Sequence, residues 1–89
     1  MQRGALRHTP AGVAVLDFRL RHESVRAQAG VPRRVELELD AIAFEATARL
    51  VAELPLECTL RVEGFLCARS RRSQRPVLHA ERIEYIEEN

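Results

Sequence analysis

The sequence predicts a small, mainly β fold, and three observations support this prediction. Several short segments alternate apolar and polar residues with the two-residue period of half-buried strands. One segment has the spacing of a short helix. No long helices alternate with the strands, whereas each parallel crossover of an α/β fold needs about a dozen residues of its own. We therefore expect four short strands and one helix in a small β-barrel, as a single domain over residues 1–89.

The first of these strands is predicted at residues 13–21. Leu16, Phe18 and Leu20 alternate there with charged residues, so Phe18 is expected in the core. Residues 23–34 mix small and charged residues without a sustained period. This lack of pattern predicts a long, mobile connection.

A second strand and the helix follow this connection. Residues 35–40 alternate cleanly, and the alternation slips at residues 41–44. Such a slip is typical of a bulge or a strong bend, and it predicts a long curved strand with Phe44 in the core. Residues 45–54 contain good helix formers at helical spacing, which predicts one or two helical turns.

The carboxyl-terminal part predicts a hairpin. Residues 57–66 and 77–86 have strand character, and Gly64 stands where a backbone can bend or be closely approached. Between them, residues 68–76 are polar and basic and have the length of an exposed hairpin loop.

Positive charge is concentrated in two segments, although the formal net charge is only +1. Residues 1–34 carry seven arginines and two acids, and residues 66–80 carry four arginines and no acid. All fourteen basic residues are arginine, which the codon usage of a GC-rich genome favours and which also suits phosphate binding and base stacking. The hairpin loop has no carboxylate of its own, so its arginines either sit in solvent or meet a polyanion.

Three blocks stand in a specific order along the chain: TPAGVAVLDFRLRHES at residues 9–24, RVEGFLC at residues 61–67 and VLHAERIEYIEEN at residues 77–89. In order and spacing they resemble the bacterial primosomal replication protein N family, known as PriB. The resemblance implies an OB-fold, a five-stranded Greek-key barrel related to single-stranded-DNA-binding proteins. It also implies a homodimer that acts in replication restart with the primosomal helicase and other primosome proteins, without a cofactor.

The amino terminus departs from the family pattern. Relatives usually begin with a longer alternating strand, and this chain starts midway along it, so the first strand is expected to be shortened. Either the start is misassigned or the protein tolerates an incomplete barrel edge, which would expose backbone donors. We predict that residues 3–10 are extended and pair with a neighbouring strand or a partner subunit.

An OB-fold binds single strands through a basic groove, helped by stacking of bases on flat side chains. Phe65 is the best stacking candidate, because it is opposite in phase to Leu60 and Val62. The resemblance places basic DNA contacts in the hairpin loop and at His8, and it puts Glu23 and Glu36 where some members carry a basic and an aromatic residue. These carboxylates would repel phosphate, and would either lower the affinity or shift the DNA path towards Arg33, Arg34 and the hairpin loop. The predicted DNA-binding residues are Arg69, Arg71, Arg72, Arg75, Phe65, Arg33, Arg34 and His8.

Catalytic, metal and membrane roles are not expected. Glu36, Glu38 and Asp40 alternate on one strand as a solvated face does. Cys58 and Cys67 are too far apart in one extended strand to pair, and no ligand spacing for a metal surrounds them. Apolar stretches of only a few residues predict neither a membrane span nor a signal peptide, hence a cytoplasmic protein.

Two other functions share these features. A general single-stranded-DNA-binding protein has the same fold and ligand, but it usually adds a flexible tail with an acidic, aromatic tip, which Glu87-Glu88-Asn89 does not supply. A protein-interaction module could instead dock its arginine loop on an acidic partner. The absence of a preference for single strands over duplex DNA would favour the interaction module.

Overall fold

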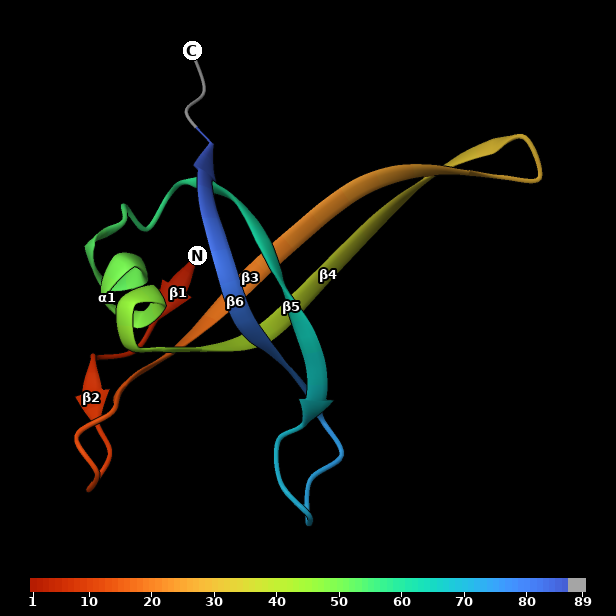
Figure 1. Cartoon of the computed structure of the whole chain (residues 1–89). Coiled ribbons are helices and arrows are strands. Elements are labelled where there is room, and N and C mark those ends of the chain that lie inside the picture. The colour runs from red at the N-terminus through yellow and green to blue at the C-terminus, as the bar shows by residue number, and fades with distance from the viewer. Residues whose placement is uncertain (87–89) are drawn as a thin grey trace.

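The computed structural model describes residues 1–86. Residues 87–89, which were compared with the tail of a general single-stranded-DNA-binding protein, lie outside the described residues. Figure 1 shows one curved sheet with a helix beside it. In chain order the elements are β1 (Gln2–Arg3), β2 (Arg7–His8), β3 (Ala14–Gln28), β4 (Val31–Phe44), α1 (Glu45–Glu53), β5 (Thr59–Ala68) and β6 (Pro76–Ile86). The prediction of a mainly β fold is confirmed.

The strands form a sheet in the order β1-β3-β4-β6-β5, and β2 also pairs with β3. β4 and β6 run parallel, and the other pairs are antiparallel. Among residues 1–86, β5 pairs with no strand other than β6, so the sheet curls without closing on itself. This is an open barrel.

The amino-terminal segment is extended along β3. Arg3 pairs with Phe18, Arg7 with Val15 and His8 with Ala14, so the predicted pairing of residues 3–10 with a neighbouring strand is confirmed at these three positions. The first strand is short and is interrupted between β1 and β2. α1, the one helix among residues 1–86, lacks the length and apolar character needed to cross a membrane.

β3 and β4 form an arm that projects from the body (Figure 1). They pair without interruption from Val15 opposite Phe44 to Gln28 opposite Val31. Ala29 and Gly30 make the turn with φ values of 53° and 77°, the left-handed backbone of a two-residue hairpin loop. The predicted mobile connection at residues 23–34 is therefore wrong. Both faces of the arm are exposed, so burial imposes no alternation on its sequence.

Residues 41–44 were predicted to contain a bulge or a strong bend within a long strand. The long strand is confirmed as β4, but there is no bulge in its pairing with β3, because the β3–β4 register passes this segment unchanged. Ala41 and Ala43 are buried and continue the inward-facing positions of β4. Ile42 and Phe44 make the outward face apolar as well, which disguises the alternation. The register shift lies instead between β5 and β6, next to Gly64, where an added Cβ would come within 1.9 Å of the His79 carbonyl oxygen. The close backbone approach predicted at Gly64 is confirmed.

The core is small and lies between the sheet and α1. Leu16 and Phe18 of β3 are 0% and 4% exposed, as the alternation of residues 13–21 predicts. Ala48 and Val51 are the buried face of α1, within the helix predicted at residues 45–54. The core cluster consists of Leu16, Phe18, Ala41, Ala43, Ala48, Val51 and Ala80.

Polar contacts fix α1 against the first strands. Arg3 donates from Nη1 to the carbonyl oxygens of Val51, at 2.9 Å, and Leu54, which satisfies acceptors that the helix end leaves open. At the other end, the Glu45 carboxylate accepts a hydrogen bond from the Ala14 N–H at 3.0 Å. The helix therefore closes the end of the barrel where β2, β3 and β4 meet.

Candidate nucleic-acid interface

Three rings from three strands form a row on the outward face of the sheet. The Phe65 ring of β5 stacks on the His79 ring of β6, with centroids 4.9 Å apart and planes inclined by 25°. The Phe44 ring of β4 lies 5.7 Å from His79 at an angle of 38°. Phe65 and Phe44 remain 50% and 40% exposed. This ring row offers flat apolar surface to solvent.

Two members of the ring row were not expected from the sequence. Phe44 was predicted in the core, which is wrong: it has the same phase along β4 as Asp40, so it points outward with that carboxylate rather than inward with Ala43. His79 was not singled out. The outward orientation of Phe44 could have been predicted from the alternation along β4. His79 can be assigned to the ring row only once its pairing with Phe65 in the β5–β6 register is known.

The arginine loop, residues 69–75, begins four residues after Phe65 and ends four residues before His79. Backbone hydrogen bonds close it: the Arg69 N–H donates to the Arg75 carbonyl at 3.1 Å, and the Ser70 N–H to the Ser73 carbonyl at 3.3 Å. The Ser73 N–H also donates to Ser70 Oγ at 3.0 Å. The loop is thus a defined turn next to the ring row.

The four arginines of this loop are not equivalent. Arg71, Arg72 and Arg75 are exposed, and none of them forms an ion pair with any residue in the described part of the chain. Arg69 instead pairs with Asp40 of β4, Nη2 to Oδ2 at 3.0 Å. The expectation that no carboxylate offsets the loop holds for Arg71 and Arg72. It is corrected for Arg69, which pairs with Asp40, and for Arg75, whose charge lowers the pKa of the same carboxylate.

Asp40 also accepts a hydrogen bond from Arg19 Nε of β3, at 3.0 Å on its other carboxylate oxygen. This hydrogen bond lowers the pKa of Asp40 below its ordinary value, and the charges of Arg19, Arg69 and Arg75 act in the same direction against partial burial. The same pairing raises the pKa of Arg19. Asp40 is therefore a carboxylate at neutral pH, held between two strands and the loop.

Two arginines and two glutamates of the arm form a network of ion pairs on its outward face. Glu23 and Glu36 are direct cross-strand neighbours, and Arg34 pairs with them at 3.3 and 3.1 Å. Arg21 pairs with the same two carboxylates at 2.9 and 3.5 Å. Two positive and two negative charges balance here. The glutamates are therefore compensated locally, and the Arg34 guanidinium is already occupied.

Arg33 and His8 lie apart from the ring row. Arg33 stands directly opposite Arg26 near the arm tip, and neither forms an ion pair with a residue between 1 and 86. His8 lies on β2 at the opposite edge of the sheet, paired with Ala14. The structure thus places Phe65 and the arginine loop next to each other on the β5–β6 hairpin, whereas Arg33 and Arg34 lie on the arm and His8 lies on β2.

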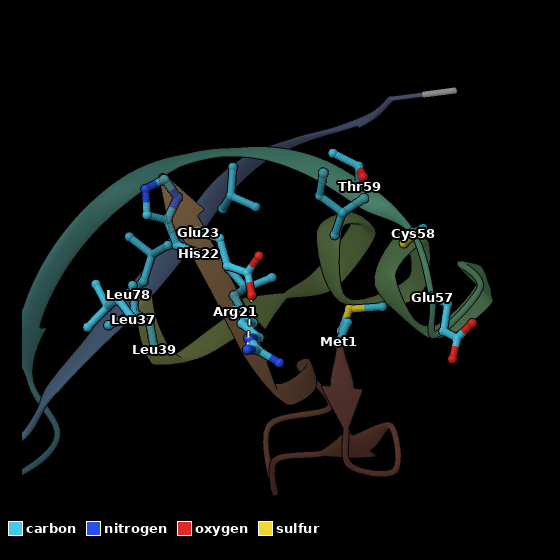
Figure 2. Close-up of a pocket in the computed structure, with 13 residues that line it drawn as sticks. Met1, Arg21, His22, Glu23, Leu37, Leu39, Glu57, Cys58, Thr59 and Leu78 are labelled. Carbon is cyan, nitrogen blue, oxygen red and sulfur yellow. Dashed lines mark ion pairs between the residues drawn. The ribbon is translucent and has the colours of Figure 1, made fainter. Parts of the chain in front are cut away.

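Away from the ring row, the sheet contains a groove of about 630 Å³, shown in Figure 2, whose lining combines apolar side chains with Arg21, His22, Glu23 and Glu57. It lies where the barrel stays open, between the inward faces of β3 and β4 and the start of β5. Its apolar lining includes Leu20, Leu37, Leu39, Leu60, Val62 and Leu78. Neither the ring row nor the arginine loop borders it.

Cys58 and Cys67 are free and half-buried. Among residues 1–86, no group of three or more His, Cys, Asp or Glu side chains could hold a metal ion.

Comparison with solved structures defines the class of fold. PriB from Ralstonia solanacearum superposes with a TM-score of 0.82 at 27% identity, over 97% of this chain and 87% of that one. The single-stranded DNA binding protein of Thermus aquaticus gives a TM-score of 0.75 at 24% identity, over 97% of this chain and 45% of that one. The fold is an OB-fold, with the open edge described above.

Sequence comparison identifies the family within this class. Residues 1–82 match a family described as "another single-strand binding protein family". Replication restart protein PriB of Bordetella pertussis is 43% identical over 83 residues, which cover 93% of this chain and 78% of the relative. PriB of Nitrosomonas europaea is 37% identical over 73 residues, or 82% of this chain and 68% of the relative. The chain belongs to the PriB family of replication restart proteins.

Proposed function

We propose that this protein binds single-stranded DNA during replication restart, through the arginine loop and the ring row. One observation carries the proposal: three exposed arginines that form no ion pair among residues 1–86 lie in the turn that joins the two strands bearing Phe65 and His79. Cationic groups for phosphates and flat rings for bases are the two elements of single-strand binding by OB-folds. The relatives are named as replication restart proteins, which supports the process.

Arg71, Arg72 and Arg75 are the proposed phosphate contacts, because their guanidinium groups form no ion pair with a carboxylate among residues 1–86, although the charge of Arg75 also acts on Asp40. Phe65 and Phe44 present the exposed ring surface for bases, and a stacked base contributes about 1–3 kcal/mol. Both kinds of contact are indifferent to base sequence. Binding should therefore be electrostatic, sensitive to salt and without sequence preference.

The outlying arginines extend this proposal along the arm. Arg33, with Arg26 opposite, is the proposed second contact for a longer oligonucleotide, because two adjacent positive charges without a counterion favour an anion. Arg34 remains a weaker candidate, since Glu23 and Glu36 share its guanidinium. His8 would contact DNA only if the strand continued across β3 to the far edge of the sheet.

We also propose that the protein is a cytoplasmic homodimer without enzymatic activity that contacts the primosomal helicase. Family membership supports this part of the proposal. The alternative of an interaction module rests on the same exposed arginines, which could bind an acidic protein surface.

Fluorescence anisotropy with a labelled deoxythymidine oligomer, at two salt concentrations and in competition with duplex DNA, tests the proposal. The binding constant should fall by about 0.7 log units per phosphate contact for each decade of salt. The variant R69A/R71A/R72A/R75A should bind more weakly and with a flatter salt dependence. Absence of any preference for single strands would favour the interaction module.

A matched pair of single variants separates the site from general charge. R71A removes an exposed loop arginine, and R49A removes an arginine of α1 that pairs with Glu45. Both change the net charge equally, but only R71A should flatten the salt dependence. Equal effects of the two variants, or unchanged affinity in the quadruple variant, would remove the loop from the site.

A further inference from the structure

Asp40 connects the arginine loop to the body of the sheet. Its two carboxylate oxygens are each 3.0 Å from a different arginine, Arg19 of β3 and Arg69 of the loop. Its side chain is 19% exposed, whereas the Arg19 and Arg69 side chains are 45% and 52% exposed. The acid therefore lies beneath two cations whose outer sides face solvent.

This arrangement sets the charge that an approaching phosphate meets. Arg19, Arg69 and Asp40 together carry +1 rather than +2, and the negative charge stands between the two guanidinium groups. A guanidinium has five donors, so each arginine could bind phosphate and keep Asp40, but the carboxylate would then repel that phosphate. Among residues 1–86, this is the only ion pair that the loop makes.

The nearest acid on the same strand provides a contrast. Glu38 lies two residues before Asp40 on the same face of β4 and is 66% exposed. It approaches Arg19 only to 3.9 Å and does not contact the loop. Glu38 has the same charge as Asp40 but forms no ion pair with Arg69.

We propose that Asp40 restrains the arginine loop, holding Arg69 beside Arg19 and competing with the DNA backbone for both guanidinium groups. Asp40 thus lowers the affinity for single strands and limits the salt dependence of binding. It is a positioning residue for the loop and not a DNA contact. This inference rests on the proposed function, because the competing ligand is the phosphate of single-stranded DNA.

The variants D40N and E38Q, which each remove one negative charge from the same strand face, test the restraint by anisotropy with a labelled deoxythymidine oligomer. We expect D40N to bind about three- to tenfold more tightly at low salt, with a salt slope steeper by about 0.7. E38Q should stay within about twofold of the wild type, as expected for an exposed charge outside the contact. In an R69A background, the gain from D40N should shrink.

A second measurement follows the loop without DNA. Nitrogen-15 relaxation of the backbone amides at residues 69–75 should show faster motion in D40N than in the wild type or E38Q. Unfolding in urea would show that the fold is retained. Loop amides that are equally ordered in D40N and the wild type would overturn the restraint.

The outcomes separate this inference from the function on which it rests. Wild-type binding with no gain in D40N, or an equal gain in E38Q, would overturn the inference and leave the proposed function standing. Binding by D40N alone would support the restraint while rejecting the wild type as a single-strand binder. Absence of binding in both would overturn both proposals.

Discussion

The ring of Phe65 on β5 stacks on the ring of His79 on β6, with centroids 4.9 Å apart, and both flank the arginine loop. Stacking fixes the Phe65 side chain while leaving half of it exposed to solvent. A preordered ring loses little side-chain entropy when a base stacks on it. The pair therefore gives the outward face a ready platform next to the exposed arginines of the loop.

Replacing Phe65 by alanine should weaken binding of a deoxythymidine oligomer by about 1–3 kcal/mol, the value of one stacked base. Stability should change little, because Phe65 is 50% exposed. Tyr85, which is 46% exposed on β6 and outside the ring row, provides the control Y85A. Equal losses in F65A and Y85A would argue against the ring row as the stacking surface.

Replacing Gly64 by alanine should destabilise the protein by about 2–4 kcal/mol, the range of severe backbone or packing conflicts. The new Cβ would lie 1.9 Å from the His79 carbonyl oxygen, so β5 and β6 would have to separate at the bulge. Urea denaturation measures the loss. Gly4→Ala is the control, because its Cβ would meet the nearest atom at an ordinary 3.5 Å. A stable G64A protein would contradict the close approach.

The pKa of Asp40 should lie below that of an ordinary aspartate, mainly because Arg19 donates a hydrogen bond to its carboxylate. Since the folded-state pKa is lowered, the interaction stabilises the fold above the ordinary pKa and is lost as pH falls through the lowered value. Carbon-13 shifts of the carboxyl group during an acid titration report it. R19A should raise the pKa of Asp40, whereas R7A, which removes the partner of Asp17 instead, should not change it.

Replacing Ala29 by glycine should slow hydrogen exchange of the arm amides. Ala29 has a φ of 53°, a left-handed conformation that costs an L-residue about 1 kcal/mol and glycine very little. A29V should have the opposite effect, because β-branched side chains tolerate this backbone poorly. Hydrogen exchange followed by NMR compares residues 23–36 with the core strands. Equal protection in the three proteins would contradict a fixed two-residue turn.

The strands that bury one face could be predicted from the sequence because burial imposes a two-residue period on them. Leu16 and Phe18 show this in β3, where both side chains lie in the core. The arm could not be predicted in the same way. Val25 and Val31 are 70% and 57% exposed, so the arm pairs without a buried face that would impose a period on its sequence.

Part of the candidate site could likewise be predicted from the sequence, and part could not. The arginine loop follows from four arginines without an acid within a short segment, a local property of the sequence. Phe65 follows from strand phase, and the structure places it outward. The outward orientation of Phe44 was not predicted in this way. Asp40, Ile42 and Phe44 lie on one face of β4, and the change from a polar to apolar residues along that face hides the alternation.

By itself, the sequence determined which segments bury a face, where the helix and the basic loop lie, and which family the residues resemble. These properties depend on neighbours within a few positions. Only the tertiary structure decided that Asp40 meets Arg69, 29 positions away, and that Phe44 and Phe65 meet through His79. The physical reason is register: the parallel pairing of β4 with β6 and the bulge in β5–β6 set which distant side chains share a face, and neither leaves a local pattern.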